Sequence, residues 1–485
     1  MRPRLELLDS NLISRVLEEA FELLETPGVK VASPVARTLL ADAGARVEDG
    51  IARIPAPLVE QALASAPKEF WLYSRTGERL VHYGGDTVQF DPGSSCLNIL
   101  DPETERPRSA LAADLVRMVR VAEMLPEYSA QATAMVCNDV PQEIGDFYRL
   151  FLVLAYSNKP VITGAFSAPT LNAMLKLLAA DSGGALNRDA PRAIFDVCPS
   201  PPLNWSEFAS ENLVQLARAG VPAEIVSMPL AGATAPVTLI GSVVQHAAEC
   251  LSGIAIHQLA HPGAPIVWGG APSIFDMTGA GTPMGAIETA MLNCACTQVG
   301  KSLGMPTHGY MVATESHLVD AQAGMESSMS AVMGALAGIN MISGAGMLDS
   351  LACHSVEKLV IDAEAIASAM RLVRGIEPRS EHLATHMFAE IGLSGEFLKL
   401  KDTRTLFRSE QHFPSSVIER GDASATFSTT FERARDRVEE LLNLYIPPSP
   451  PQLEALQEVA LHEADRVGLC TLPGLGSELD SIHSV

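Results

Sequence analysis

The chain has 485 residues, of which 47% are hydrophobic and 19% are charged, so an extended disordered protein is excluded. Its 34 basic and 57 acidic residues give a net charge of −23, which argues against binding to nucleic acid or to an anionic membrane surface. The mean hydropathy is +0.17, but the sequence contains no uninterrupted run of about 20 apolar residues.

Two features of the sequence bear on the cellular compartment of the protein: its first residues and its cysteines. Residues 1–9 lack the apolar stretch of a secretion signal, and the eight cysteines are scattered through apolar segments. This distribution is typical of buried, reduced thiols rather than of a disulfide framework. We therefore expect a cytoplasmic protein.

The first 86 residues predict a mixed α+β extension. Apolar residues at helical spacing predict helices over residues 11–24 and 58–66. Two short apolar segments, residues 70–73 and 79–83, predict a β-hairpin.

From residue 87 to residue 376, short apolar runs alternate with longer helical stretches in eight cycles. The strand candidates are residues 88–100, 129–137, 160–166, 192–198, 223–228, 265–268, 307–312 and 340–343. The helices between them are predicted over residues 110–125, 145–155, 171–178, 206–219, 237–259, 284–303, 320–337 and 356–373. Eight such cycles predict an α/β fold, a parallel sheet closed into a (β/α)8 TIM barrel, with an open doubly wound sheet as the rival.

Residues 377–485 predict a helical C-terminal extension. We expect a charge-rich helix over residues 431–442, a stiff proline-rich linker over residues 446–451, and a helix from there to residue 467. Such an arm typically packs on the barrel or on a neighbouring subunit, and we expect a homo-oligomer.

Functional side chains of such barrels lie at the carboxyl ends of the strands and in the loops that follow. After the seventh strand, His317 and Glu326 are candidate catalytic residues, and Gln322 between them is a candidate substrate contact. Glu288, early in the helix after strand six, is a third catalytic candidate. The alternative is that Ser316 caps its helix and that the acidic residues lie near the positive helix end, which favours negative charge.

Aromatic residues lie at or near several predicted strand ends: Phe166, Trp205, Trp268, Phe275 and Tyr310. Aromatic rings around a barrel mouth can enclose a quaternary ammonium group by cation–π attraction, so we treat these five as candidate substrate contacts. The alternative is that each ring belongs to the ordinary hydrophobic core.

Polar and glycine residues complete the set of candidates. Asp91 and Asn204 follow strands one and four and are candidate substrate contacts. Gly344 and Gly346 follow strand eight, where barrels commonly bind phosphate, and are candidate cofactor contacts. The alternative, which the sequence favours, is that the two glycines form a tight turn with close packing.

Other chemistries find less support in the sequence. Cys294 and Cys296 stand in a predicted helix at a spacing that does not share a face, and no histidine has ligand spacing to them, so we expect no metal. A Gly-x-Ser-x-Gly motif of serine hydrolases is absent. Lys301 and Lys358 lie on predicted helices rather than at strand ends, which argues against a Schiff-base lysine.

Several of these segments resemble the trimethylamine methyltransferase family. The specific ones are residues 314–326 (TESHLVDAQAGME) and 336–348 (LAGINMISGAGML), and weaker ones are residues 285–290, 52–60 and 407–410. The similarity spans nearly the whole chain.

The resemblance implies a barrel that moves a methyl group from a methylated amine to the cob(I)alamin-type cofactor of a separate corrinoid protein. It implies a small-molecule amine and a corrinoid protein as partners, and no cofactor tightly bound to this chain. Archaeal members of the family carry pyrrolysine in the barrel. This chain has only standard residues, and the pyrrolysine position falls at or next to His317.

This departure bears on the methyl donor. A tertiary amine is a poor donor until its nitrogen becomes cationic, whereas a quaternary ammonium leaves as a neutral amine. Attack by Co(I) then needs mainly positioning and desolvation. We therefore expect a quaternary amine such as glycine betaine, proline betaine or carnitine. A tertiary methylamine, another N-, O- or S-methyl donor, and a non-catalytic betaine-binding barrel remain the alternatives.

Overall fold

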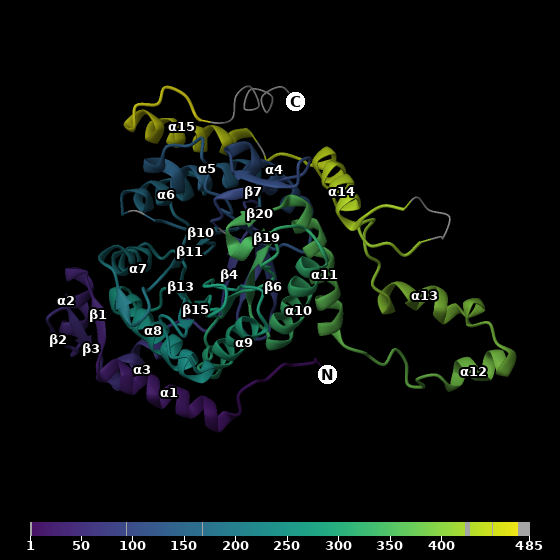
Figure 1. The fold of residues 1–485 in the computed structure, drawn as a ribbon, viewed down its shortest axis with the longest axis horizontal. Coiled ribbons are helices and arrows are strands. Elements are labelled where there is room, and N and C mark those ends of the chain that lie inside the picture. The colour runs from purple at the N-terminus through teal and green to yellow at the C-terminus, as the bar shows by residue number, and fades with distance from the viewer. Residues whose placement is uncertain (1, 94, 167, 422–426, 449, 474–485) are drawn as a thin grey trace.

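The computed structural model describes residues 2–93, 95–166, 168–421, 427–448 and 450–473, and eight parallel strands form its centre (Figure 1). These strands are β6 (Gln89–Pro92), β9 (Gln131–Ala132), β10 (Val161–Gly164), β11 (Ala193–Val197), β13 (Ala223–Ser227), β15 (Ile266–Gly270), β17 (His308–Tyr310) and β18 (Met341–Ala345). Strands β9, β10, β11, β13 and β15 pair in that order, as do β17, β18 and β6. Two parallel bridges, Trp268 with Thr307 and Phe90 with Tyr128, join both ends of these groups into a ring.

A helix follows each strand and packs on the outside of the ring (Figure 1). These helices are α4 (Ala112–Met124), α5 (Gly145–Tyr156), α6 (Ala168–Asp181), α7 (Glu207–Ala219), α8 (Leu239–Ala260), α9 (Ile287–Ser302), α10 (Ala321–Ala337) and α11 (Val356–Arg374). Side-chain oxygens of Ser206, Asp320 and Ser355 accept backbone N–H groups at the starts of α7, α10 and α11, which fixes where these helices begin. The predicted alternation of helices and parallel strands is confirmed.

The first predicted strand, residues 88–100, is wrong in its extent because it forms two strands. Ser95 has a positive φ of 63° and turns the chain after β6. The second half becomes β7 (Asn98–Asp101), which pairs with β8 (Arg106–Ser109) and β20 (Cys353–His354). Strand β19 (Met347–Leu348) completes this sheet, and β14 (Leu230–Ala231) pairs with β16 (Ser273–Ile274) at the same carboxyl end of the ring, which we call the mouth.

The N-terminal residues cover the side and the opposite end of the ring. They form α1 (Ser10–Glu25), β1 (Val29–Val31), α2 (Pro34–Asp42), β2 (Arg46–Glu48), β3 (Ile51–Arg53), α3 (Ala56–Ser65), β4 (Phe70–Tyr73) and β5 (Arg79–Tyr83). Strand β12 (Asn204–Trp205) joins the small sheet of β1, β2 and β3. The β4–β5 hairpin is the predicted one, and its Leu72 and Val81 pack against Ile162 and Met341 at the amino ends of barrel strands.

Helix α8 is the one element among the described residues with the length and apolarity of a membrane span. Most of it, 83% of its apolar window, is buried inside the protein. It contacts α1, α3, α7 and α9. Its apolar character therefore reflects a core position.

The C-terminal residues first project away from the barrel and then pack on it again. Helices α12 (Thr385–Ile391) and α13 (Lys401–Glu410) project away from the barrel (Figure 1). Helix α14 (Thr430–Leu444) packs on α11 and α4, and α15 (Pro450–Arg466) packs on α6 and α5. Part of the predicted proline-rich linker, residue 449, lies outside the described residues.

Candidate active site

Three carboxyl groups lie inside the ring, and we call them the acid cluster: Asp91 of β6, Asp196 of β11 and Glu224 of β13. Alternate residues of a strand face the same side. Ile194 of β11 packs in the apolar cluster formed with the closing hairpin, so Asp196, two residues further, also faces inwards. The acid cluster is thus one layer above the apolar floor of the barrel.

A chain of hydrogen bonds connects two members of the acid cluster. The Ser343 hydroxyl donates to Asp91 Oδ1 at 2.5 Å, and Nε2 of His308 lies 2.7 Å from Ser343 Oγ. On its other side, Nδ1 of His308 contacts Oε2 of Glu224. The imidazole of His308 thus bridges Ser343 and Glu224, and through Ser343 it connects Glu224 with Asp91.

The aromatic ring of Tyr310 lies beside these hydrogen-bonded residues. Its hydroxyl donates to Asp196 Oδ2 at 2.8 Å, and its ring stacks on that of His308 with 5.2 Å between the centroids. Both rings are buried. The stacked pair offers π faces next to carboxyl groups, which is the combination that favours an organic cation.

Burial controls the protonation of these groups. It raises the pKa of Glu224 and of Asp91 well above the ordinary range, and a hydrogen bond from Ser343 opposes the shift for Asp91. Burial raises the pKa of Asp196 to about 8, and repulsion from Glu224 acts in the same direction. Burial lowers the pKa of His308 to about 4. At neutral pH the imidazole is neutral, and Asp196 holds a proton that a bound cation can displace.

The acid cluster has unused acceptors and an opening. Asp91 Oδ2 and Asp196 Oδ1 are buried and accept no hydrogen bond in the part of the chain that the structure describes. Buried carboxyl oxygens normally have a partner. Glu224 is fully buried, whereas Asp196 and Cys198 are half-buried, so the cluster is least enclosed along β11.

A second cluster of polar residues lies at the mouth between α9 and α10. It contains most of the predicted catalytic residues. Glu326 accepts hydrogen bonds from the Thr314 hydroxyl (2.5 Å), the Glu315 N–H (3.0 Å) and the Gln322 amide (3.0 Å). Glu326 therefore holds the loop after β17 in place. Asp320, rather than Ser316, caps α10, and its carboxylate accepts the Ala323 N–H at 3.0 Å.

His317 belongs to the same loop but faces solvent. Its side chain is 78% exposed, and its Nδ1 lies 3.1 Å from Asp349 Oδ1. Glu288 lies half-buried in the first turn of α9. The structure thus gathers His317, Gln322 and Glu326 at the rim of the mouth, while the acid cluster lies inside the barrel.

Two predicted aromatic residues lie at the mouth. Phe166 follows β10 and is 60% exposed, and Phe275 follows β16 and is half-buried. The guanidinium of Arg149, from α5, lies over Phe166 at 5.4 Å from the ring centre. Arg149 also donates to Ser95 Oγ at 3.1 Å and to the Thr133 carbonyl at 3.0 Å, and it pairs with Asp146 at 3.0 Å.

The expectation that Trp205 and Trp268 lie at the mouth is wrong. Trp205 is completely buried on β12 and donates its indole N–H to Ser252 of α8. Trp268 points outwards from β15 and donates to the Cys296 carbonyl of α9. Both rings fill the layer between strands and helices, where apolar burial outweighs any role at the surface.

Asn204, Gly344 and Gly346 also have local structural explanations. Asn204 pairs with Lys30 of β1 in the small N-terminal sheet rather than facing the ring. A Cβ on Gly344, where φ is +133°, would lie 1.9 Å from the Met311 carbonyl oxygen. The Gly346 N–H is taken by Asp362 at 2.8 Å. The two glycines permit close backbone packing, and one amide is already engaged.

Sequence reasoning found Asp91 and Tyr310 but missed Asp196, Glu224 and His308. These three lie within predicted strands, whereas the search concentrated on the loops after the strands. The available signal was a single charged residue inside an otherwise apolar strand, as in Phe195-Asp196-Val197 and Ala223-Glu224-Ile225. Such a charge is buried and therefore needs a partner or a function.

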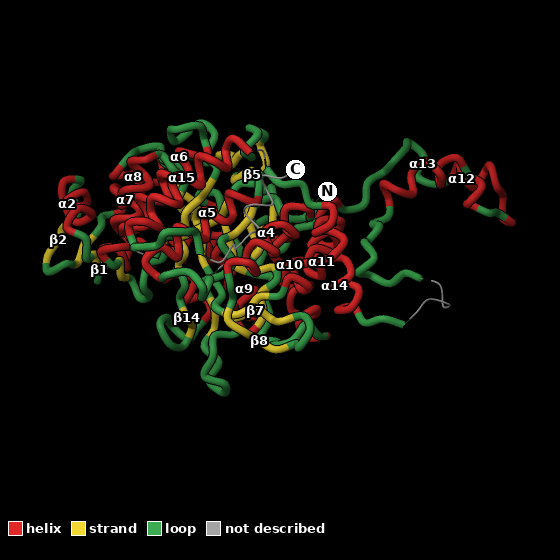
Figure 2. Tube along the Cα trace, turned by 90° about the horizontal axis from the view of Figure 1, so that it is seen from above, coloured by secondary structure: helices red, strands yellow, loops and turns green. Residues whose placement is uncertain are grey.

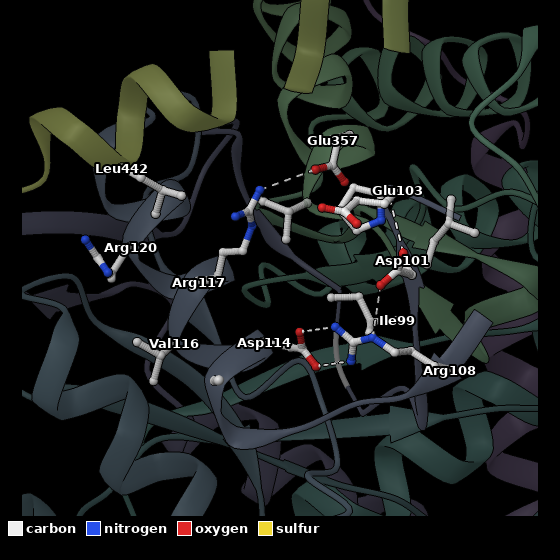
Figure 3. A pocket seen from close by; sticks show the side chains of 14 residues that line it. Ile99, Asp101, Glu103, Arg108, Asp114, Val116, Arg117, Arg120, Glu357 and Leu442 are labelled. Atoms are coloured by element: carbon white, nitrogen blue, oxygen red, sulfur yellow. Dashed lines mark hydrogen bonds and ion pairs between the residues drawn. The ribbon is translucent and has the colours of Figure 1, made fainter. Parts of the chain in front are cut away.

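A separate groove of about 380 Å³ lies outside the barrel, between α4, α11 and α14 (Figure 3). Its charged side chains face one another: Arg108 pairs with Asp114 at 2.6 Å, and Arg117 lies 3.6 Å from Glu357. Arg117 also pairs with Glu439 of α14 at 3.0 Å. Because these charges compensate one another, we assign the groove to the attachment of α14 rather than to catalysis.

Comparison with known proteins places the chain in a family. Residues 1–464 match the trimethylamine methyltransferase (MTTB) family. The trimethylamine methyltransferase MttB of Desulfitobacterium hafniense is 28% identical over 457 residues, which cover 92% of each protein. A glycine betaine methyltransferase of the same species is 26% identical over 475 residues, which cover 96% of this chain and 98% of that protein.

Solved structures show the same fold. The crystal structure of the Methanosarcina barkeri monomethylamine methyltransferase (MtmB) is similar with a TM-score of 0.51 at 14% identity, covering 96% of this chain and 89% of that chain. The sequence match covers nearly the whole chain and agrees with the segments around residues 314–348. The chain therefore belongs to the trimethylamine methyltransferase (MTTB) family.

Proposed function

We propose that the protein transfers a methyl group from a betaine-type quaternary amine to the corrinoid cofactor of a separate protein. The observation that carries this proposal is the acid cluster inside the barrel, with its unpaired carboxyl oxygens and the stacked rings of His308 and Tyr310. Family membership supports methyl transfer as the reaction class.

The acid cluster suits a cation that brings its own positive charge. A quaternary ammonium cannot donate a hydrogen bond, so it binds through charge and through π faces rather than through directed bonds. Its charge favours the ionised forms of Asp91, Asp196 and Glu224, whose pKa values burial holds high. The nitrogen needs no proton before the methyl group leaves, so no acid–base residue has to act on it.

The residues of the chain then position the donor and exclude water. The stacked rings and the carboxyl groups hold the ammonium in the buried layer, so that a methyl group points along the barrel axis to the mouth. The corrinoid supplies the Co(I) nucleophile from that side. Burial of the donor removes water that would otherwise shield the positive charge.

A betaine also carries a carboxylate, and Arg149 is the group that we propose to meet it. Its guanidinium spans the loops after β6, β9 and β10, and charge-assisted hydrogen bonds from Arg to a carboxylate are strong. Asp146 already pairs with this guanidinium, so we expect a moderate contribution to affinity. We further propose that His317, Gln322, Glu326 and Glu288 act at the rim, where donor and acceptor meet.

The mouth has the surface that docking of a corrinoid protein needs. Exposed apolar side chains project from six of its βα connections: Leu97, Val136, Phe166, Met228, Val237, Met277, Ile287, Leu318, Met325 and Met329. Exposed apolar side chains gathered at one end of a protein are typical of an interaction site. We call these ten residues the mouth ring and propose that the corrinoid protein covers it.

The test is a methyl-transfer assay with the purified protein, a reduced corrinoid protein and a panel of donors. The panel contains glycine betaine, proline betaine, carnitine, tetramethylammonium and trimethylamine, and methylcobalamin formation is followed by absorbance. We expect turnover of at least one betaine, and R149Q should raise KM for that betaine about tenfold, which is about 1.4 kcal/mol, while tetramethylammonium is unaffected. Trimethylamine as the sole donor would contradict the proposed substrate class.

A further inference from the structure

Residues 376–418, which we call the arm, expose an unusual amount of apolar surface. Figure 1 shows α12 and α13 at the far end of the molecule, away from the barrel. The exposed apolar residues of the arm are Ile376, Leu383, Phe388, Leu393, Phe397, Leu398, Phe413 and Ile418. Leu393 and Leu398, at its tip, are 102% and 81% exposed. Surface of this kind needs a partner.

Among the described residues, the contacts that fix the arm to its own barrel lie at its root. Arg371 of α11 donates to the Glu410 carbonyl at 2.8 Å, and the Ser415 N–H donates to Glu364 of α11 at 2.9 Å. Val417, at the end of the arm, is completely buried. The tip therefore projects in a direction set by α11, and it is held out rather than folded back.

A groove lies between α12 and α13, and the segment that joins these two helices carries the side chains that can fill one. The groove has a volume of about 800 Å³ and is lined by Ile376, Leu383, Met387 and Leu406. The charged residues at its edge satisfy one another, since His386 pairs with Asp402 at 2.9 Å and Arg379 pairs with Glu410. The apolar floor is left without a partner in the described part of the chain. When two copies are related by a two-fold axis, the projecting side chains of each arm can occupy the groove of the other.

The position of the arm and its net charge both favour a second copy of the chain as the occupant of the groove. In Figure 2 the arm lies at the level of β5, at the amino end of the barrel, whereas β7, β8 and β14 of the mouth lie on the other side. A protein docked on the mouth ring would therefore leave the arm uncovered. The arm contains five Lys and Arg residues against six Asp and Glu residues, so its charge is −1 in a chain of −23. Two arms can approach without the repulsion that other faces of two such acidic chains experience.

We propose that the arm is a self-association element: the tip of one arm, with Leu393 and Leu398, inserts into the groove between α12 and α13 of a second copy of the chain, and the second copy does the same. The contact is isologous, so two arms bury two tips and two grooves. The arm falls within the segment that matches the family, residues 1–464. The proposal is independent of the methyl donor.

The first test measures molar mass by light scattering of the full-length protein at micromolar concentration. We expect wild type at a multiple of 51.5 kDa, and L393S/L398S at half of that mass or less. L444S/L461S is the matched control, because it replaces two exposed leucines of α14 and α15, and it should keep the wild-type mass. Circular dichroism establishes that both variants fold.

The second test locates the contact. In a C470S background, which removes the exposed native thiol, L393C and M387C chains with different tags are mixed and oxidised. A disulfide between the two tags places the tip of one copy in the groove of another. A wild-type protein of 51.5 kDa, or an L393S/L398S variant with unchanged mass, would overturn the proposal. Loss of binding to the corrinoid protein in L393S/L398S, with wild type monomeric, would assign the arm to that partner instead.

Discussion

Asp196 is the member of the acid cluster whose charge changes near neutral pH. Below its pKa of about 8 the carboxyl is protonated and neutral, and above it the carboxylate attracts an ammonium group. We therefore expect KM for a quaternary amine to fall as pH rises from 6 to 8, by up to roughly tenfold per pH unit. D196N should flatten this dependence, while D189N, on an exposed loop, should keep it. A KM that rises with pH in wild type would contradict the assignment.

The same shift affects stability with a definite sign. A carboxyl whose pKa is raised on folding keeps its proton in the folded state, whereas in the unfolded chain it ionises above the ordinary value of 3.8. Its contribution to stability is thus complete below pH 3.8 and is lost as pH rises towards 8. D196N should raise Tm relative to wild type more at pH 8.5 than at pH 5, as measured by thermal denaturation. An equal effect at both pH values would mean that Asp196 does not titrate as described.

A substitution of Trp268 distinguishes a role in the hydrophobic core from a role in substrate binding. Its indole fills the space over Gly300 and donates to Cys296, so W268F loses one hydrogen bond and some packing. We expect a loss of about 1–3 kcal/mol in the free energy of unfolding, with kcat/KM unchanged at a temperature where the variant is folded. Denaturant unfolding and the methyl-transfer assay measure the two quantities. A selective rise in KM for the donor would instead indicate that Trp268 contributes to substrate binding.

At the residue scale, the sequence predicted the site in part. Asp91 and Tyr310 were among the candidates, although the extent of the strand that contains Asp91 was predicted wrongly, and both lie inside the ring. Trp205 could not be placed, because its strand pairs with residues near Val31, far away in the sequence. The link between Glu224, His308 and Ser343 joins three strands, and such a contact is a property of ring closure rather than of any local pattern.

At the element scale, Arg117 of α4 holds the C-terminal helix α14. It lies between Glu357 of α11, which is buried, and Glu439 of α14. R117A leaves Glu357 buried without its cation, so we expect a loss of about 1–2 kcal/mol, less than for a fully buried pair because Arg117 is partly exposed. R46A, in an exposed pair, is the control and should change stability little. Urea unfolding gives both values, and equal values would contradict this role of Arg117.

The barrel elements themselves were predictable because their signals are local. Apolar periodicity and caps such as Ser355 mark helices, and short apolar runs mark buried strands. The failure at residues 88–100 has a physical cause, since both halves are apolar and only the backbone turn at Ser95 separates them. The projection of α12 and α13 was not predictable, because the sequence of an amphipathic helix such as α13 does not show whether its apolar face packs on the barrel.

At the scale of the whole molecule, the mouth ring offers a prediction about the partner. M325E/M329E places two negative charges on exposed apolar positions of α10. We expect this variant to raise KM for the corrinoid protein about tenfold or more, because charges replace apolar contacts, with the KM of the donor unchanged. L444S/L461S is again the control. Titration of the corrinoid protein in the methyl-transfer assay provides both constants, and a change in the donor KM alone would contradict the docking surface.

The central claim is that the acid cluster inside the barrel binds the ammonium group of the donor. A crystal structure with glycine betaine tests it most directly, because without the corrinoid acceptor the donor cannot react and the complex is stable. We predict the trimethylammonium group between Asp196, Glu224 and the ring of Tyr310, with its carboxylate directed to Arg149. Density for the donor at the rim beside His317 and Glu326, with the acid cluster empty, would contradict the account.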